Sequence, residues 1–194
     1  VALCGHATLA ASATLFEHLG WSRDDVVFQT NDAGPLRAVR RDDVVELDFP
    51  ALPASDAPMP EGIEAGLGGV QPEDYVQSSF GMAVLSSEAE VRAVRPDRDF
   101  LLALDTDGLI VTGPGDACDC ASRYFAPHAG IDEDPVTGSA HCTIAPYWAR
   151  RLGTSSLHAR QVSTRGGDLY CTVAADRVRL AGRSRLYLQG TIHV

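Results

Sequence analysis

The feature that most constrains the fold is an internal repeat: the sequence matches itself when it is shifted by 133 positions. The register runs without a gap from Gly5 opposite Gly138 to Leu47 opposite Leu180. Identical residues make up only about a fifth of this overlap, so the constant register and the matching order of elements carry the argument. A repeat of this length predicts two copies of one structural unit.

Each copy shows the same order of predicted elements. A turn of small residues, GHAT at 5–8 or TGSA at 137–140, leads into a helix with apolar residues at helical spacing. Gly20 and Gly153 follow these helices, where glycine favours a left-handed C-terminal cap. Alternating segments then predict strands over 26–30, 36–40 and 44–49 in the first copy, and over 159–164, 169–173 and 177–182 in the second.

A segment rich in proline and small residues, 49–62, predicts a linker between the copies. We therefore expect residues 1–55 to belong to a first domain, 56–185 to form a second, and 186–194 to be a closing strand that returns to the first domain. Between the copies we expect a short helix ending at 66–69, strands at 82–87 and 109–113, a helix begun by a Ser87 and Glu90 capping box, and a helix after Asp97.

Composition excludes several classes of partner. With 45% hydrophobic and 22% charged residues, the chain has the composition of a globular protein. Its net charge of -10 provides no basic field for nucleic acid, and no apolar run reaches the roughly 18 residues that span a bilayer. We predict a cytoplasmic protein that binds neither nucleic acid nor membrane.

The basic residues and cysteines bear on cofactors. All 16 basic residues are arginine, so this chain has no lysine to form an aldimine with pyridoxal phosphate. The five cysteines are scattered and odd in number, which favours reduced thiols over a disulfide framework. Cys118 and Cys120 are the alternative metal pair, but their segment alternates as a strand does. We predict no metal and no organic cofactor.

Two helix starts of similar design predict an anion site. The free backbone amides and the positive dipole end of a helix attract anions, so two facing starts suit a small carboxylate. His6 and Ser139 occupy equivalent positions, each immediately after the glycine of its turn, Gly5 or Gly138. One copy therefore supplies an imidazole where the other supplies a hydroxyl.

His6, Asp134 and Ser139 are the candidate catalytic residues. Histidine carries protons near neutral pH, and a buried aspartate just before the second turn would suit proton exchange. The alternatives are helix-capping roles for His6 and Asp134. Ser139 lies in TGSAH, not in a GxSxG elbow, so we expect it to donate a hydrogen bond and not to attack as a nucleophile.

Cys4 and Cys142 lie near the two helix starts, and Cys4 is a candidate acid or base. Cys4 comes just before the first helix, where a small buried thiol is the favoured alternative to a catalytic role. Cys142 lies three residues beyond Ser139 and is not the twin of Cys4. Epimerisation by two facing thiols is therefore disfavoured.

The strings LCGHATLAAS and YFAPHAGIDEDPVTGSAHC, followed by QVSTRGG, carry a family resemblance. With them the sequence resembles the phenazine-biosynthesis PhzF-like isomerases along essentially its whole length. The resemblance implies an α+β diaminopimelate epimerase-like fold: two pseudo-symmetric domains, each a curved, barrel-like sheet around a central helix, with the site between them. It also implies a homodimer.

The resemblance implies a cofactor-independent proton shift on a small carboxylate such as a dihydro-hydroxyanthranilate. His6, Asp134 and Ser139 match catalytic motif positions, and Gly5, His6, Gly138 and Ser139 match substrate-binding ones. Family members carry their principal base, a glutamate, in a Ser-Glu-Thr-Ala-Phe segment upstream of the GHAT motif, whereas this sequence opens at Val1. We therefore expect a truncated first domain and impaired activity. The alternative is a non-catalytic carboxylate-binding protein or a degenerate fragment.

Overall fold

The computed structural model of the chain describes residues 5–30 and 34–191. Its helices are α1 (Gly5–Glu17), α2 (Ile63–Gly66), α3 (Glu88–Ala93), α4 (Arg98–Ala103), the 3₁₀ helix η1 (Pro127–Ala129) and α5 (Gly138–Leu152). Its strands are β1 (Asp25–Gln29), β2 (Pro35–Arg41), β3 (Val44–Pro50), β4 (Ser55–Asp56), β5 (Asp74–Gln77), β6 (Gly81–Val84), β7 (Leu109–Pro114), β8 (Cys120–Ala126), β9 (Ile131–Asp134), β10 (Ser156–Gln161), β11 (Gly167–Ala174) and β12 (Arg177–Gly182).

The predicted repeat is present in the fold. A shift of 133 places α1 on α5 and β1, β2 and β3 on β10, β11 and β12. Even the hairpin turns agree, because Asp42 and Ala175, which are equivalent under this shift, both have positive φ, at 49° and 52°. Gly20 and Gly153 are both left-handed, as expected, although Gly153 caps α5 directly whereas Gly20 lies three residues past the end of α1.

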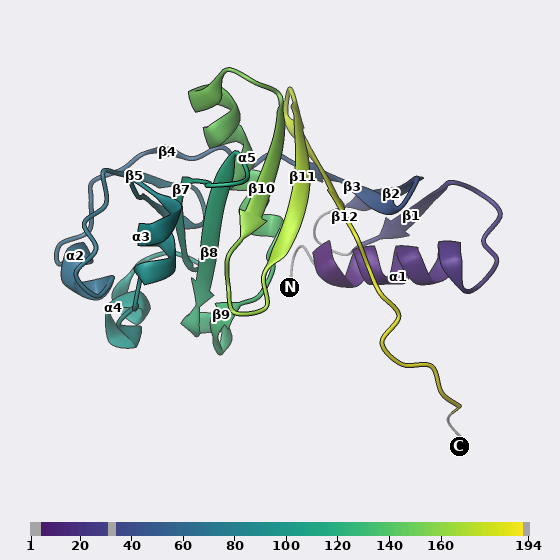
Figure 1. Cartoon of the computed structure of the whole chain (residues 1–194), viewed down its shortest axis with the longest axis horizontal. Coiled ribbons are helices and arrows are strands. Elements are labelled where there is room, and N and C mark those ends of the chain that lie inside the picture. The colour runs from purple at the N-terminus through teal and green to yellow at the C-terminus, as the bar shows by residue number, and fades with distance from the viewer. Residues whose placement is uncertain (1–4, 31–33, 192–194) are drawn as a thin grey trace.

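The strands form one large mixed sheet in the order β1-β2-β3-β12-β11-β10-β8-β7-β6-β5-β4, with β9 beside β8. The two copies meet where β3 pairs antiparallel with β12, with Phe49 opposite Val178. Figure 1 shows β1 to β3 over α1 on one side of this junction and the remaining strands on the other. This mixed α+β architecture with a large sheet confirms the predicted fold class at that level.

The two repeat helices differ in how far they are enclosed. In α5 every residue from Ala140 to Ala149 is buried except Pro146, so this helix is central to its part of the sheet. In α1 the buried side chains are Ser12, Ala13 and Phe16, which form one face toward β2 and β3. A helix that is buried all round needs mostly apolar residues, and seven of the nine buried residues of α5 are Ala, Cys, Ile, Tyr or Trp.

The predicted linker crosses α5 next to Pro146, where one backbone carbonyl of the helix has no partner within the helix. Pro146 has no N–H, so the carbonyl of Cys142, four residues earlier, lacks its partner within the helix. The amide of Leu52 donates to that carbonyl at 2.9 Å, and the Thr143 hydroxyl donates to the Leu52 carbonyl at 2.9 Å. The chain between the two copies is thereby fixed on the central helix.

Most elements between the copies agree with the sequence. The Ser87 hydroxyl accepts from the Glu90 amide at 3.2 Å, and the Glu90 carboxylate accepts from the Ser86 amide at 2.9 Å, so the capping pair forms with a one-residue offset. The sequence missed β4, β5 and β9, which are short. The predicted closing strand is wrong for residues 186–191, which form no strand, and 192–194 lie outside the described residues.

The predicted division into domains at 55 and 56 falls within the two-residue strand β4 and stays a prediction. Within the described ranges, no helix is both long and apolar enough to cross a membrane.

Candidate active site between the two helix starts

A cavity of about 1000 Å³ lies where the N-terminal ends of α1 and α5 meet. All five predicted site residues line it: Gly5, His6, Asp134, Gly138 and Ser139. The remaining walls come from the crossing segment, the β5–β6 and α4–β7 loops, β8, η1 and β9. Segments more than 130 positions apart in the chain therefore share one site, while the individual roles of the five residues stay predictions.

Glycine allows the two helix starts to touch. A Cβ atom on Gly5 would lie 3.5 Å from the Cα atom of Gly138, and one on Gly138 would lie at the same distance from Gly5. A methyl group would thus fill the contact, and a larger side chain would have to push the helices apart or enter the cavity. His6 and Ser139 are the next residues along the chain. Each lies in the first turn of its helix, and both line the cavity.

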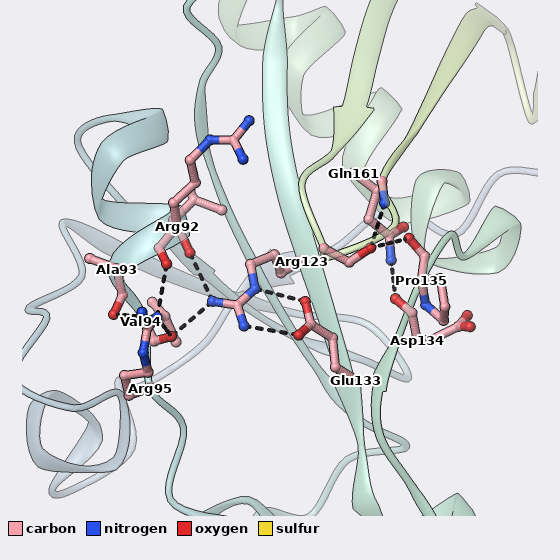
Figure 2. Close-up of polar contacts among 12 residues, drawn as sticks. Arg92, Ala93, Val94, Arg95, Arg123, Glu133, Asp134, Pro135 and Gln161 are labelled. Carbon is pink, nitrogen blue, oxygen red and sulfur yellow. Dashed lines mark hydrogen bonds and ion pairs between the residues drawn. The ribbon is translucent and has the colours of Figure 1, made fainter.

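Asp134 and its neighbour Glu133 have different surroundings. Asp134 is half-buried, not buried as predicted, because β9 lies at the cavity where Asp134 forms part of the lining. Glu133 instead accepts two hydrogen bonds from Arg123, at 2.7 and 3.0 Å, on the other side of β9 (Figure 2). Of these two neighbouring carboxylates, Glu133 is therefore engaged by Arg123, whereas Asp134 lines the cavity.

Arg123 anchors β9 to α3. Its guanidinium donates to the carbonyls of Val91, at 3.3 Å, and Val94, at 2.8 Å, as well as to Glu133. Figure 2 shows the guanidinium between the end of α3 and β9. The side chains of Arg123 and Glu133 are only 12% and 24% exposed, so this bidentate pair is largely shielded from water.

The loop wall of the cavity was not predicted from the sequence. The Ser78 hydroxyl lies 3.1 Å from that of Thr143, whose hydrogen is directed at Leu52, so Ser78 donates to Thr143. The α4–β7 loop lies beside this fixed loop, because the Asp107 amide donates to the Ser79 carbonyl at 2.9 Å. Its residues Asp105 and Asp107 are exposed and line the cavity. The cavity thus combines amide-rich helix starts with an acidic loop.

Tyr124 is a further polar group that sequence reasoning missed. It lies on β8, lines the cavity, and donates its hydroxyl hydrogen to the Asp107 carbonyl at 3.3 Å. Burial, with the nearby carboxylates of Asp107 and Asp134, raises the pKa of Tyr124 to about 12. Its hydroxyl therefore keeps its proton at neutral pH and is not a base.

The thiols of the described residues do not serve the site. Cys142 is fully buried, and burial raises the pKa of its thiol to about 12, which disfavours a thiolate at neutral pH. Cys118 donates its thiol hydrogen to the carbonyl of Cys120 at 3.3 Å. The prediction on Cys4 lies outside the described residues. Within 5–30 and 34–191, no three His, Cys, Asp or Glu side chains are grouped to hold a metal ion.

His141 supports the second helix start from inside the core. Its Nδ1 lies 2.8 Å from the Thr137 carbonyl, and since a carbonyl only accepts, Nδ1 carries the hydrogen. Complete burial lowers the pKa of His141 to about 4, against the opposing effect of the bond to Thr137. The imidazole is therefore neutral in the folded protein at neutral pH.

We expect this histidine to make stability sensitive to acid. Between pH 6.5 and about 4 the unfolded chain binds a proton that the folded chain does not, so acid favours unfolding. The stabilisation is complete above pH 6.5 and falls by about 3 kcal/mol as the pH approaches 4. Urea unfolding above pH 6.5 and near pH 4 measures the loss. The free energy of unfolding should fall less for His141→Gln than for the wild type between these two conditions. His18→Gln, at an exposed position, should behave as the wild type, and equal losses in all three proteins would contradict the assignment.

The fold and the site together define an α+β protein with one large mixed sheet, in which two related helix starts meet at one cavity. A similar fold occurs in the crystal structure of a hydroxyproline epimerase from Agrobacterium vitis, with a TM-score of 0.53 at 12% identity over 95% of this chain and 64% of that one. At this identity the likeness concerns the fold alone.

The chain belongs to the PhzC-PhzF family of phenazine biosynthesis-like proteins, whose model matches residues 1–191. It is 46% identical to an uncharacterized isomerase of Pseudomonas aeruginosa, over all of this chain and 74% of that protein. It is 36% identical to the human phenazine biosynthesis-like domain-containing protein, over 99% of this chain and 73% of that protein. The crystal structure of a PhzF-family protein from Enterococcus faecalis matches all of this chain and 74% of its own, with 38% identity and a TM-score of 0.95.

Proposed function

We propose that this protein is a PhzF-like isomerase that moves a proton between carbon atoms of a small carboxylate, such as a dihydro-hydroxyanthranilate, without a cofactor. The observation that carries the proposal is the position of Asp134 at the cavity where the two helix starts meet, with His6 and Ser139 beside them. Relatives named as isomerases at 46% and 39% identity support the reaction class.

The site suits each part of such a reaction. The substrate carboxylate would lie against the backbone at the two helix starts, where the helix dipoles favour an anion, with a hydrogen bond from Ser139. A base removes a proton from carbon, the electron pair moves along the conjugated system, and Asp134 or His6 returns a proton at a second carbon. Asp105 and Asp107, which also line the cavity, suit a substrate that carries an amino group as well. No electrons are gained or lost in this scheme.

Solvent deuterium exchange tests the proposal directly. Dihydro-hydroxyanthranilate in D₂O should gain deuterium on carbon, seen by NMR, about 100-fold or more faster with protein than without it. The resemblance assigns the proton-removing base to an upstream Ser-Glu-Thr-Ala-Phe segment, so protein that carries such a segment before Val1 should exchange faster than these 194 residues alone.

A calorimetric titration with the same compound separates the alternative. Binding without exchange in either protein would indicate a carboxylate-binding protein and would overturn the isomerase proposal. If the folded protein shows neither binding nor exchange, this compound is not its substrate. The homodimer and the cytoplasmic location stay predictions.

A further inference from the structure

The turn that carries Asp134 is held by a buried glutamine from another part of the chain. Gln161, at the end of β10, is completely buried, and its Oε1 accepts from the Thr137 amide at 2.8 Å. Its Nε2 donates to the Asp134 carbonyl at 2.6 Å (Figure 2). The same Nε2 donates to the Thr137 hydroxyl oxygen at 3.2 Å. The Ser163 hydroxyl also donates to the Pro135 carbonyl, at 2.8 Å, so the turn is held at three successive peptide units.

The partners of Gln161 leave one orientation for its amide. The Thr137 N–H can only donate and the Asp134 carbonyl can only accept. Turning the amide over would set two donors against each other at Thr137 and two acceptors against each other at Asp134. Because the group is buried, water cannot compensate for such a mismatch. Nε2 therefore donates, and the Thr137 hydroxyl oxygen accepts from it.

This orientation determines where the Thr137 hydrogen points. Having accepted from Gln161, the hydroxyl donates its own hydrogen to Oδ2 of Asp134, at an oxygen-to-oxygen distance of 2.5 Å. This length is at the short end of the range for hydrogen bonds between two oxygen atoms. Thr137 makes no side-chain cap to α5, so this hydroxyl is committed to Asp134 and Gln161.

We propose that Gln161 and Thr137 are positioning residues that reserve Oδ2 of Asp134 as an acceptor and leave Oδ1 to carry the transferred proton. When Oδ1 is protonated, Oδ2 is the carbonyl oxygen of the acid and still accepts from Thr137. The carboxyl group thus keeps one orientation while it takes up and delivers its proton, which removes a reorganisation step. This inference rests on the proposed function of Asp134, whereas the hydrogen-bond chain itself does not.

The variants Thr137→Val and Thr137→Ser test whether the Thr137 hydroxyl assists proton transfer by Asp134. The valine variant preserves shape without the hydroxyl and should lower kcat for deuterium exchange about 10- to 100-fold, with KM within about 3-fold of the wild type. The serine variant keeps the hydroxyl and should recover most of that loss. Thr154→Val, at the far end of α5 beyond Gly153, is the matched control. Wild-type kcat in Thr137→Val, or an equal loss in Thr137→Ser, would overturn the positioning role.

Neutron diffraction from D₂O-exchanged crystals tests the chain without turnover. We expect the Thr137 hydroxyl deuterium on the line to Oδ2 of Asp134, and Gln161 amide deuterium directed at the Asp134 carbonyl and the Thr137 hydroxyl oxygen. A Thr137 deuterium directed elsewhere would refute the inference even in an active enzyme. If the deuterium atoms lie as expected but the protein exchanges no substrate, the hydrogen-bond chain is confirmed and only the proposed function is contradicted.

Discussion

Replacing Asp134 with asparagine should lower the rate of deuterium exchange about 100-fold, with little change in substrate affinity. Asparagine keeps the size of the side chain, and its oxygen can accept the Thr137 hydrogen bond as Oδ2 does. Only the capacity to hold a transferable proton is lost. The measurement is NMR-detected exchange at saturating and at limiting substrate, which separates kcat from KM.

Asp132→Asn is the matched control for this experiment. Asp132 lies two residues before Asp134, but its side chain is 85% exposed and contacts Arg98 at 3.4 Å. The control should exchange as fast as the wild type. Comparable losses in both variants would mean that the charge of the region matters and not proton transfer by Asp134. Full activity in Asp134→Asn would assign proton return to His6.

Replacing Arg123 with methionine should lower the free energy of unfolding by about 3–4 kcal/mol. Methionine fills much of the space but leaves Glu133 without its bidentate partner and removes the hydrogen bonds to Val91 and Val94. Since both members of the ion pair are mostly shielded from water, the remaining carboxylate stays poorly solvated. Urea unfolding measures the loss.

Two further variants show whether this loss of stability comes from the Glu133 carboxylate that is left without its partner. Glu133→Gln added to Arg123→Met should restore part of the stability, because no unpaired carboxylate then remains. Arg98→Met breaks a pair whose side chains are 59% and 85% exposed and should cost less than about 1 kcal/mol. Equal costs for Arg123→Met and Arg98→Met would contradict the burial argument.

Local signals explain why much of the fold was predictable. The repeat strands were found because alternation and turn residues are read from neighbouring positions, and β12 matches its predicted range of 177–182. The closing strand was not predictable in this way, since RLYLQG has the composition of a strand but residues 186–191 have no strand partner in the described structure. Strand formation requires that partner, which local pattern does not supply.

The sequence by itself determined the two-copy organisation, the two helix starts and the placement of His6, Asp134 and Ser139 near them. These features depend on residues that are close in the chain or equivalent in the repeat. Only the tertiary structure decided that Glu133 faces Arg123, that Tyr124 lines the cavity, and that Gln161 donates to the Asp134 carbonyl. The last contact spans 27 positions and forms because β10 lies beside β8, so no local pattern of residues encodes it.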